Sequence, residues 1–259
     1  MNKKKSVPRP GQKSVRNQYY LYGTHPVLAA LHNPNRQILE ISCSENVYEQ
    51  YKDIIGKHKY QIVTNAKLSG MLKADATHQG IAALVKCIAE NDLQAIDLSD
   101  PNTKIAILDQ ITDIHNIGAI MRSAAGFGIK AIIMTHDNSP EENGAMAKAA
   151  SGALEIVPLV RVTNLRSTID LLKKQGFWIA GLDGEATQSI DQANLSGKIA
   201  LILGAEGKGM RRLTLESCDM ILSIPIQKSM ESLNVSSAAA IVFYAATIAS
   251  TIGPKHTQK

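Results

Sequence analysis

The chain has few aromatic residues and few cysteines. Of its 259 residues, 4% are aromatic and three are cysteines, Cys43, Cys87 and Cys218. The cysteines are far apart in the sequence and form no CxxC pair. An odd number of widely spaced cysteines argues against a disulfide framework and against a zinc site. We therefore expect a reduced, cytoplasmic protein that holds no metal.

Acidic residues are missing from positions 1–18, which carry six of the 28 Lys and Arg residues. The rest of the chain has 22 basic and 23 acidic residues, so this segment accounts for the net charge of +5. The segment also lacks the apolar run of a signal peptide, and its polarity predicts a disordered basic arm. Such an arm fits either binding to a polyanion such as RNA or a solubilising tail.

Charged side chains are also missing from residues 232–254, a stretch long enough to cross a bilayer. However, it contains Asn234, four serines and two threonines, and no cationic cluster flanks it directly, which argues against a membrane span. Several alanines would let another helix approach closely. We therefore predict a buried helix at the core or at a subunit interface, and no membrane partner.

Short apolar runs alternate with helical patterns over residues 19–87. The strand-like runs are ILEISCS at 38–44, YQIVTN at 60–65 and IAALVKC at 81–87, with a helical stretch from Asn46. This alternation predicts a small α/β domain. Residues 88–103 are acidic and end in a Pro-Asn turn, so we expect them to form a linker.

A more regular alternation runs through residues 104–259. Its apolar runs are KIAILD at 104–109, KAIIMT at 130–135, EIVPLV at 155–160, FWIAGLD at 177–183, KIALILG at 198–204 and ILSIPI at 221–226. Helical segments between such runs, one of them from Asn164 to Gln175, predict a parallel sheet with helices on both faces. Ligands bind beyond the carboxyl ends of such strands, which directs attention to loops 109–118, 203–211 and 225–236.

The stretch LILGAEGKGM at 201–210 has its glycines in the order G-x-x-G-x-G. This order differs from the dinucleotide fingerprint and from the phosphate-binding P-loop. The stretch is then a glycine turn around Glu206. This turn has either a purely structural role or the role of holding a functional carboxylate at the end of a strand.

The other two loops also carry candidate polar residues. Asn116 is a predicted helix N-cap, and Arg122 follows about 1.7 helical turns later, as a site residue or as a solvated charge. Ser232 and Asn234 are predicted caps of the long apolar helix. A helix start at a strand end offers free N–H donors as well as these side chains.

Together, the three loops resemble the motifs of the SpoU (TrmH) family of RNA ribose 2′-O-methyltransferases. The matching stretches are DIHNIGAIMRSAAGFG at 113–128, LILGAEGKGMRRLTLESCDMILSIPI at 201–226 and SLNVSSAAA at 232–240. YGTHPVLAAL at 22–31 and HQGIAALV at 78–85 resemble the L30e-like, RNA-binding domain of the subgroup that methylates a guanosine in bacterial 23S rRNA.

The resemblance implies an α/β-knot (SPOUT) fold, in which the parallel sheet ends in a deep trefoil knot, for residues 104–259. It also implies S-adenosyl-L-methionine as the cofactor and a homodimer as the working form. It makes the backbone of Gly204, Ile224 and Leu233 the cofactor-binding positions.

The same resemblance assigns catalytic roles. Arg122 is the central catalytic residue, as a general base or as a cation that stabilises the 2′-oxyanion. Asn116 and Asn234 orient Arg122 or the ribose, Ser232 contacts RNA or Arg122, and Glu206 positions a catalytic side chain or one of the partner subunit.

The function this implies is 2′-O-methylation of a guanosine in 23S rRNA. The alternatives are a tRNA guanosine 2′-O-methyltransferase and an RNA-binding assembly factor without catalysis. Four residues depart from the family pattern: Ile114 replaces a common proline, Gln227-Lys228 stands where a glycine is usual, and Glu231 replaces a small residue.

Overall fold

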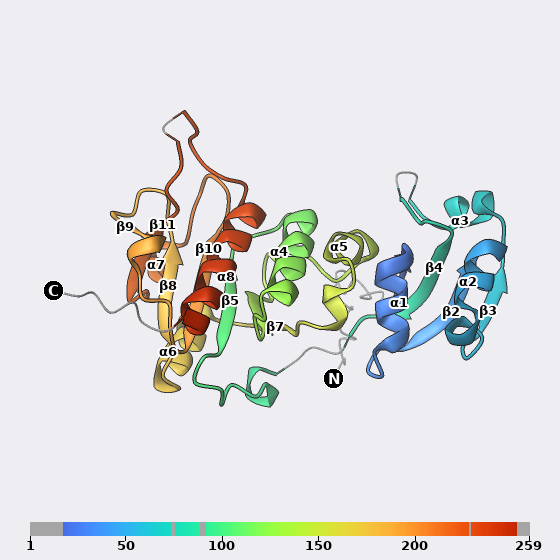
Figure 1. The fold of residues 1–259 in the computed structure, drawn as a ribbon, viewed down its shortest axis with the longest axis horizontal. Coiled ribbons are helices and arrows are strands. Elements are labelled where there is room, and N and C mark those ends of the chain that lie inside the picture. Colours follow the sequence, from blue (N-terminus) through green and yellow to red (C-terminus); the bar gives the residue numbers. More distant parts are fainter. Residues whose placement is uncertain (1–17, 74–75, 89–91, 228, 253–259) are drawn as a thin grey trace, which may run out of the picture.

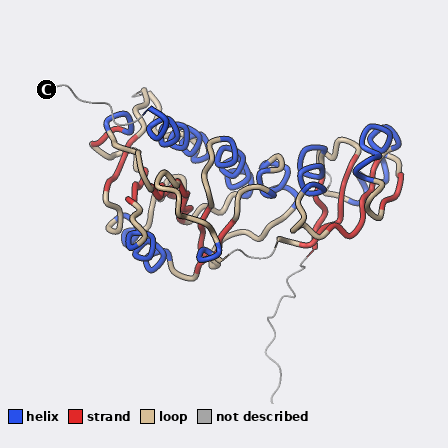
Figure 2. The backbone as a smooth tube through the Cα atoms, turned by 60° about the horizontal axis from the view of Figure 1, so that its bottom comes forward, coloured by secondary structure: helices blue, strands red, loops and turns tan. Residues whose placement is uncertain are grey.

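A computed structural model of the chain describes residues 18–73, 76–88, 92–227 and 229–252. The predicted basic arm, apart from its last residue, therefore lies outside the described residues, as do Lys228 and three positions of the expected linker. Figures 1 and 2 show an elongated arrangement in which a small sheet with its helices occupies one end and a larger sheet the other.

The small sheet is built from residues 18–86 in the strand order β1-β4-β2-β3. Its elements are β1 (Gln18–Tyr22), α1 (Thr24–His32), β2 (Ile38–Cys43), α2 (Glu45–Ile55), β3 (Tyr60–Ile62), α3 (Asn65–Met71) and β4 (Ile81–Lys86). Strand β4 runs antiparallel to both β1 and β2, whereas β3 runs parallel to β2. The three predicted strands are present, and β1 is an additional strand that the sequence reasoning did not identify.

The larger sheet has the strand order β7-β6-β5-β10-β8-β11-β9, and all its strand pairs are parallel. Its strands are β5 (Lys104–Asp109), β6 (Ile132–Thr135), β7 (Leu159–Val162), β8 (Trp178–Leu182), β9 (Gln188–Ser189), β10 (Ile199–Gly204) and β11 (Met220–Ser223). Its helices and 3₁₀ turns are η1 (Leu93–Ala95), α4 (Ile114–Gly126), α5 (Gly144–Ala150), η2 (Ala153–Glu155), α6 (Leu165–Lys174), η3 (Ile190–Gln192), α7 (Arg212–Leu215) and α8 (Val235–Ile252). The predicted parallel sheet is confirmed.

Helices cover both faces of the larger sheet, as predicted. Alternate residues of a strand point to opposite faces, and in β5 Ala106 and Leu108 pack in the core cluster that contains α4 and α8. Ile105 and Ile107 pack instead with buried residues of α6. Because the central strands are buried on both sides, they read in the sequence as continuous apolar runs.

Helix α6 shows how local sequence sets an element. The Asn164 side chain caps it by accepting a hydrogen bond from the Ser167 amide at 3.1 Å, which agrees with the predicted start. Ile169 and Leu172 face the core, and Lys173 and Lys174 lie in the last turn, where cations interact favourably with the helix dipole.

Two local predictions are wrong. Strand β7 begins at Leu159 rather than Glu155, because residues 153–155 form η2. Asn116 is not a helix cap. Asp113 accepts a hydrogen bond from the His115 amide at 2.8 Å, so α4 begins at Ile114 and Asn116 lies within its first turn. Both residues are suitable caps, and the first one in the chain takes the position.

Helix α8 occupies most of the long uncharged stretch. Val242, Phe243 and Ala246 are fully buried, whereas Ile241 and Tyr244 remain 40% and 54% exposed. The helix therefore buries one face against the sheet and α4 and leaves apolar side chains on the other. Within the described ranges, no helix has the length and apolar character needed to cross a membrane.

Candidate functional site at the carboxyl ends of the sheet

A cavity of about 390 Å³ opens at the carboxyl ends of the neighbouring strands β8, β10 and β11. Its walls come from the segment after each strand and from the start of α8. The lining residues are Leu182, Asp183, Gly184, Leu203, Gly204, Ala205, Glu206, Gly207, Gly209, Leu222, Ile224, Ile226, Gln227, Met230, Glu231, Ser232, Leu233, Val235 and Ala238. A crevice at this edge of a parallel sheet is the position expected for a ligand site.

The glycine turn after β10 forms one wall. Ala205 and Gly209 exchange backbone hydrogen bonds of 3.1 and 2.8 Å, and Gly207 and Gly209 have φ angles of 75° and 63°. A Cβ atom on Gly204 would lie 2.5 Å from the Met210 amide nitrogen, closer than real Cβ atoms come. The turn therefore folds back tightly on the strand end, and this close approach requires glycine at position 204.

A buried carboxylate anchors the far end of this turn. The side chain of Asp109, at the end of β5, is fully buried. It accepts hydrogen bonds from the Arg211 amide at 2.8 Å and from Arg211 Nε at 2.7 Å. This pair was not predicted, although an acidic residue directly after the four apolar residues at 105–108 is a signal that could have found Asp109.

Three polar side chains from the three motif loops meet beside the cavity. Glu206 Oε1 accepts hydrogen bonds from Asn234 Nδ2 at 2.7 Å, the Val235 amide at 3.1 Å and Asn116 Nδ2 at 3.4 Å. Asn234 Nδ2 also donates to Asn116 Oδ1 at 3.0 Å. We call Asn116, Glu206 and Asn234 the polar triad. The structure brings these predicted site residues together.

The start of α8 explains the position of the triad. The Asn234 Oδ1 atom accepts a hydrogen bond from the Ser236 amide at 2.9 Å, which confirms Asn234 as a cap. The Glu206 carboxylate satisfies the free Val235 amide, where the helix dipole favours negative charge. Ser232 is not a cap, because α8 begins three residues later. It lies exposed on the cavity wall.

Arg122 does not join the triad. It lies on α4, about 9 Å along the helix axis from Asn116 at 1.5 Å per residue. Its side chain is exposed and makes no hydrogen bond or ion pair with any residue that the structure describes. The guanidinium is therefore available to a binding partner.

The three predicted cofactor positions, Gly204, Ile224 and Leu233, all line the cavity. The sequence analysis missed the wall that follows β8. There Asp183 lies at the cavity and its Oδ1 accepts a hydrogen bond from the Glu185 amide at 2.9 Å. The carboxyl-end rule that selected the other loops applies equally to FWIAGLD, so the signal was present.

Gln227 and Glu231, which depart from the family pattern, also line the cavity. They frame a turn in which the Met230 amide donates to the Gln227 carbonyl at 2.9 Å. These departures therefore lie at the site itself. Within the described part of the chain, no three His, Cys, Asp or Glu side chains are arranged to hold a metal ion.

Comparison with known proteins places this geometry in a family. Residues 103–244 match the SpoU rRNA Methylase family, and residues 20–88 match the RNA 2′-O ribose methyltransferase substrate-binding family. The 23S rRNA (guanosine-2′-O-)-methyltransferase RlmB of Vibrio parahaemolyticus is 40% identical over 235 residues, which cover 88% of this chain and 95% of the relative. The protein of the same name from Escherichia coli K12 is 47% identical over 174 residues, covering 66% of this chain and 72% of the relative.

Solved structures show the same fold. The SpoU methyltransferase AviRb from Streptomyces viridochromogenes, in complex with AdoMet, has a TM-score of 0.77 at 20% identity, covering 90% of both chains. An AdoMet-bound rRNA methyltransferase from Sinorhizobium meliloti has a TM-score of 0.74 at 18% identity, covering 89% of this chain and 87% of the other. The chain belongs to the SpoU rRNA methylase family.

Proposed function

We propose that this protein transfers the methyl group of S-adenosyl-L-methionine to the ribose 2′-hydroxyl of a guanosine in 23S rRNA. The relatives that match most of the chain carry this activity in their names. The observation that carries the proposal is a cavity lined by the second and third motif loops, with the polar triad at its rim linking them to Asn116 of the first loop.

The cavity fits the proposed cofactor. Its volume lies in the range of small-molecule sites. Leu203, Leu222 and Ile224 offer an apolar surface, and the backbone of Gly204, which has no side chain, faces the cavity where the polar edge of an adenine could bind. The cavity also contains carboxylates, which suit a ligand that carries hydroxyls and positive charge. When bound, the cofactor supplies an activated methyl group on a sulfonium.

The triad suits a positioning role. Methyl transfer to a hydroxyl needs the nucleophile held in line with the methyl group. Glu206 fixes the amides of Asn116 and Asn234, and the remaining capacity of these side chains can orient the ribose or the Arg122 side chain. Ser232, exposed on the wall, adds a hydroxyl that can contact RNA.

Arg122 suits electrostatic stabilisation. A guanidinium has five N–H donors and no acceptor atom, which disfavours the role of general base. An exposed guanidinium can bind the neighbouring phosphate bidentately and stabilise the developing 2′-oxyanion. This role explains why Arg122 lacks a partner in the described chain.

The proposal includes the oligomeric state and the domain organisation of the protein. We infer a cytoplasmic homodimer, an RNA-binding domain over residues 19–87, a linker over 88–103 and a methyltransferase domain over 104–259. The exposed Ile241 and Tyr244 on α8 support a dimer contact, because Tyr244 packs edge-on against Phe127, directly after α4, and extends one apolar surface. Light scattering coupled to gel filtration tests the dimer. The trefoil knot stays a prediction.

Labelled cofactor tests the activity. Incubation with 23S rRNA that lacks the modification should yield labelled 2′-O-methylguanosine after nuclease digestion. Absence of transfer, alongside an active RlmB control, would refute the proposal. Label in tRNA but not in rRNA would favour the tRNA alternative. RNA binding without cofactor binding in calorimetry would favour the assembly-factor alternative.

A further inference from the structure

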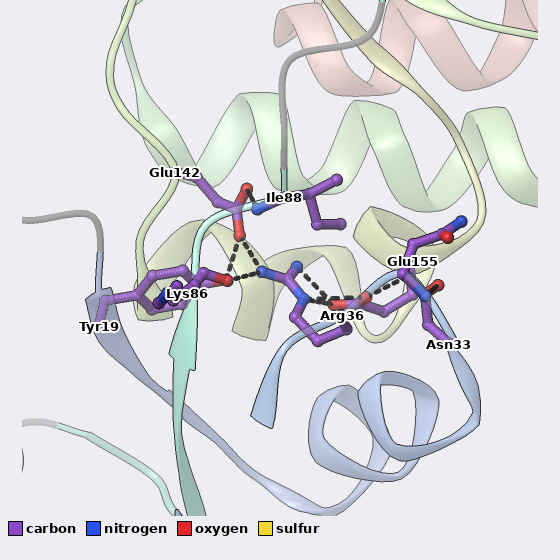
Figure 3. Close-up of polar contacts among 8 residues, drawn as sticks. Tyr19, Asn33, Arg36, Lys86, Ile88, Glu142 and Glu155 are labelled. Atoms are coloured by element: carbon purple, nitrogen blue, oxygen red, sulfur yellow. Dashed lines mark hydrogen bonds and ion pairs between the residues drawn. The ribbon is translucent and has the colours of Figure 1, made fainter. Parts of the chain in front are cut away.

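A buried arginine joins the small sheet to the larger one. Arg36, in the loop between α1 and β2, has a fully buried side chain. Its Nη1 atom donates to Glu142 at 2.5 Å and its Nη2 atom donates to Glu155 at 2.6 Å. Figure 3 shows the guanidinium between the two carboxylates, which come from the segment before α5 and from η2. We call these three residues the arginine bridge.

The carboxylates of the bridge take further donors from the small-sheet part of the chain. Glu142 accepts from the Tyr19 hydroxyl at 2.6 Å and from the Ile88 amide at 3.2 Å, as Figure 3 shows. Glu155 accepts from Asn33 Nδ2 at 2.7 Å. All these contacts of Glu142 and Glu155 cross from residues 19–88 to residues 142–155, while Arg36 Nη1 also donates to the Lys86 carbonyl at 2.8 Å within the small-sheet part.

The guanidinium of the arginine bridge keeps its positive charge although it is buried. Burial alone would lower the pKa of Arg36, but the hydrogen bond that it donates to Glu155 and the nearby carboxylates raise it overall. Burial and the Glu142 carboxylate raise the pKa of Tyr19, which stays a neutral donor. The guanidinium faces two carboxylates. Its removal would leave both of them buried without an opposite charge, which is costly unless water enters.

Glycines make the same junction tight. A Cβ atom on Gly144, the first residue of α5, would lie 2.7 Å from Tyr22 Cε1 of β1 and would collide with the Tyr20 carbonyl. Gly152, with a φ angle of 96°, lies against Ala29 of α1, where a Cβ would come within 2.9 Å. The backbones on either side therefore touch directly.

A third glycine continues the contact to the site. A Cβ atom on Gly118 of α4 would lie 2.6 Å from Ala149 Cβ and 2.6 Å from the Met146 carbonyl of α5. Gly118 is two residues from Asn116 of the polar triad. A continuous series of close contacts thus runs from the small sheet through α5 and α4 to the triad, and Figure 1 shows α5 and α4 between the two ends.

We propose that Arg36 is a positioning residue that fixes the small-sheet part of the chain relative to the polar triad, and thereby selects which nucleotide of a bound RNA reaches the cavity. The inference rests on the proposed function for its RNA substrate. Because the small-sheet part matches a substrate-binding family, a rotation at the junction would displace bound RNA relative to Asn116.

The test is Arg36→Met in the full chain, with Arg166→Met as the matched control. Among the described residues, Arg166 forms only an exposed pair with Asp170 at 3.5 Å. Arg36→Met should leave affinity for S-adenosylhomocysteine within about twofold of wild type, because the cavity is remote. The kcat for 23S rRNA should fall by on the order of 100-fold, with KM changed far less, because small displacements at a reacting centre have effects of this size.

Two readouts distinguish positioning from general destabilisation. Mapping of 2′-O-methyl groups should show methylation spreading to neighbouring nucleotides in Arg36→Met. Hydrogen exchange should increase in β1 and α5 but not in β10.

Gly144→Ala is a second variant, which widens the same junction from the side of α5. It should give the same changes in kcat, target position and hydrogen exchange, and it tests the proposal if Arg36→Met does not fold. Wild-type kcat, target position and exchange in either folded variant would overturn the inference. Wild type that binds no cofactor and methylates no RNA would instead refute the proposed function, and the exchange comparison would still test the junction.

Discussion

Arg36 and Arg122 are the same residue type in opposite surroundings. The Arg36 side chain is fully buried and its donors are taken by two carboxylates and the Lys86 carbonyl. The Arg122 side chain is exposed, with no partner among the described residues. A guanidinium whose donors are satisfied within the chain can only hold parts of the protein in place. One whose donors are free can act on a ligand.

The largest effect is expected at the free guanidinium. Arg122→Ala should lower kcat for methyl transfer by about 10²- to 10³-fold, the cost of removing a group that stabilises developing negative charge. The melting temperature should stay unchanged, because the side chain has no described partner to lose. Single-turnover transfer and thermal melts measure the two quantities, and Arg122→Lys retains charge without the bidentate geometry. Turnover near the wild-type value would remove Arg122 from the mechanism.

Substitutions in the polar triad test whether this partly exposed cluster holds side chains in place, as the buried arginine bridge does. Glu206→Ala removes the acceptor shared by Asn234, Val235 and Asn116 and should lower kcat by about 10- to 100-fold. Glu206→Gln keeps an acceptor oxygen and should retain more activity. Equal activity of the two variants in the rRNA transfer assay would contradict a role through hydrogen bonding.

A substitution at Gly204 tests whether the cavity wall needs a close backbone contact, like those at Gly144 and Gly152 in the junction. Gly204→Ala places a methyl group against the Met210 amide and should weaken cofactor binding about tenfold and stability by about 1 to 3 kcal/mol. Gly70→Ala is the control, because a Cβ there meets nothing within 4 Å and alanine favours the helix. Calorimetry and urea unfolding measure both effects. Unchanged affinity in Gly204→Ala would show that the wall tolerates displacement.

The smallest effect is expected at Lys104, a buried cation that forms no hydrogen bond with any carboxylate of the described residues. It donates to the Gly197 carbonyl, and burial lowers its pKa from 10.5 to about 8. Above pH 8 the unfolded chain binds the proton that the folded chain releases, so this residue makes stability rise with pH, by about 1 kcal/mol between pH 8 and 9. Urea unfolding of wild type and Lys104→Met at several pH values should show the rise only in wild type. Parallel curves would exclude Lys104 as its source.

The sequence predicts the larger sheet well because its strands are buried on both faces. The runs at 104–109 and 199–204 stand out as strands, and their carboxyl ends locate Glu206 and the triad. It predicts Asn116 as a cap wrongly because Asp113 is an equally suitable cap only three residues earlier.

The arginine bridge escaped sequence reasoning for a different reason. Arg36 lies in a loop without periodicity, and Glu142 and Glu155 are 106 and 119 residues away along the chain. No local sequence pattern predicts a contact between residues so far apart in the chain. The tertiary arrangement of the two sheets creates it, just as it leaves Arg122 exposed.

The start of α8 has a consequence for the order in which the protein becomes active. Ser232, Leu233, Asn234 and Val235 contribute one cavity wall and one member of the triad, and among the residues of the site only Ala238 of the same helix follows them in the chain. During synthesis, the small sheet leaves the ribosome long before these residues do. The part of the chain that matches a substrate-binding family is therefore available early, whereas the cavity is complete only when α8 has packed. A nascent or truncated chain that lacks α8 has no completed site.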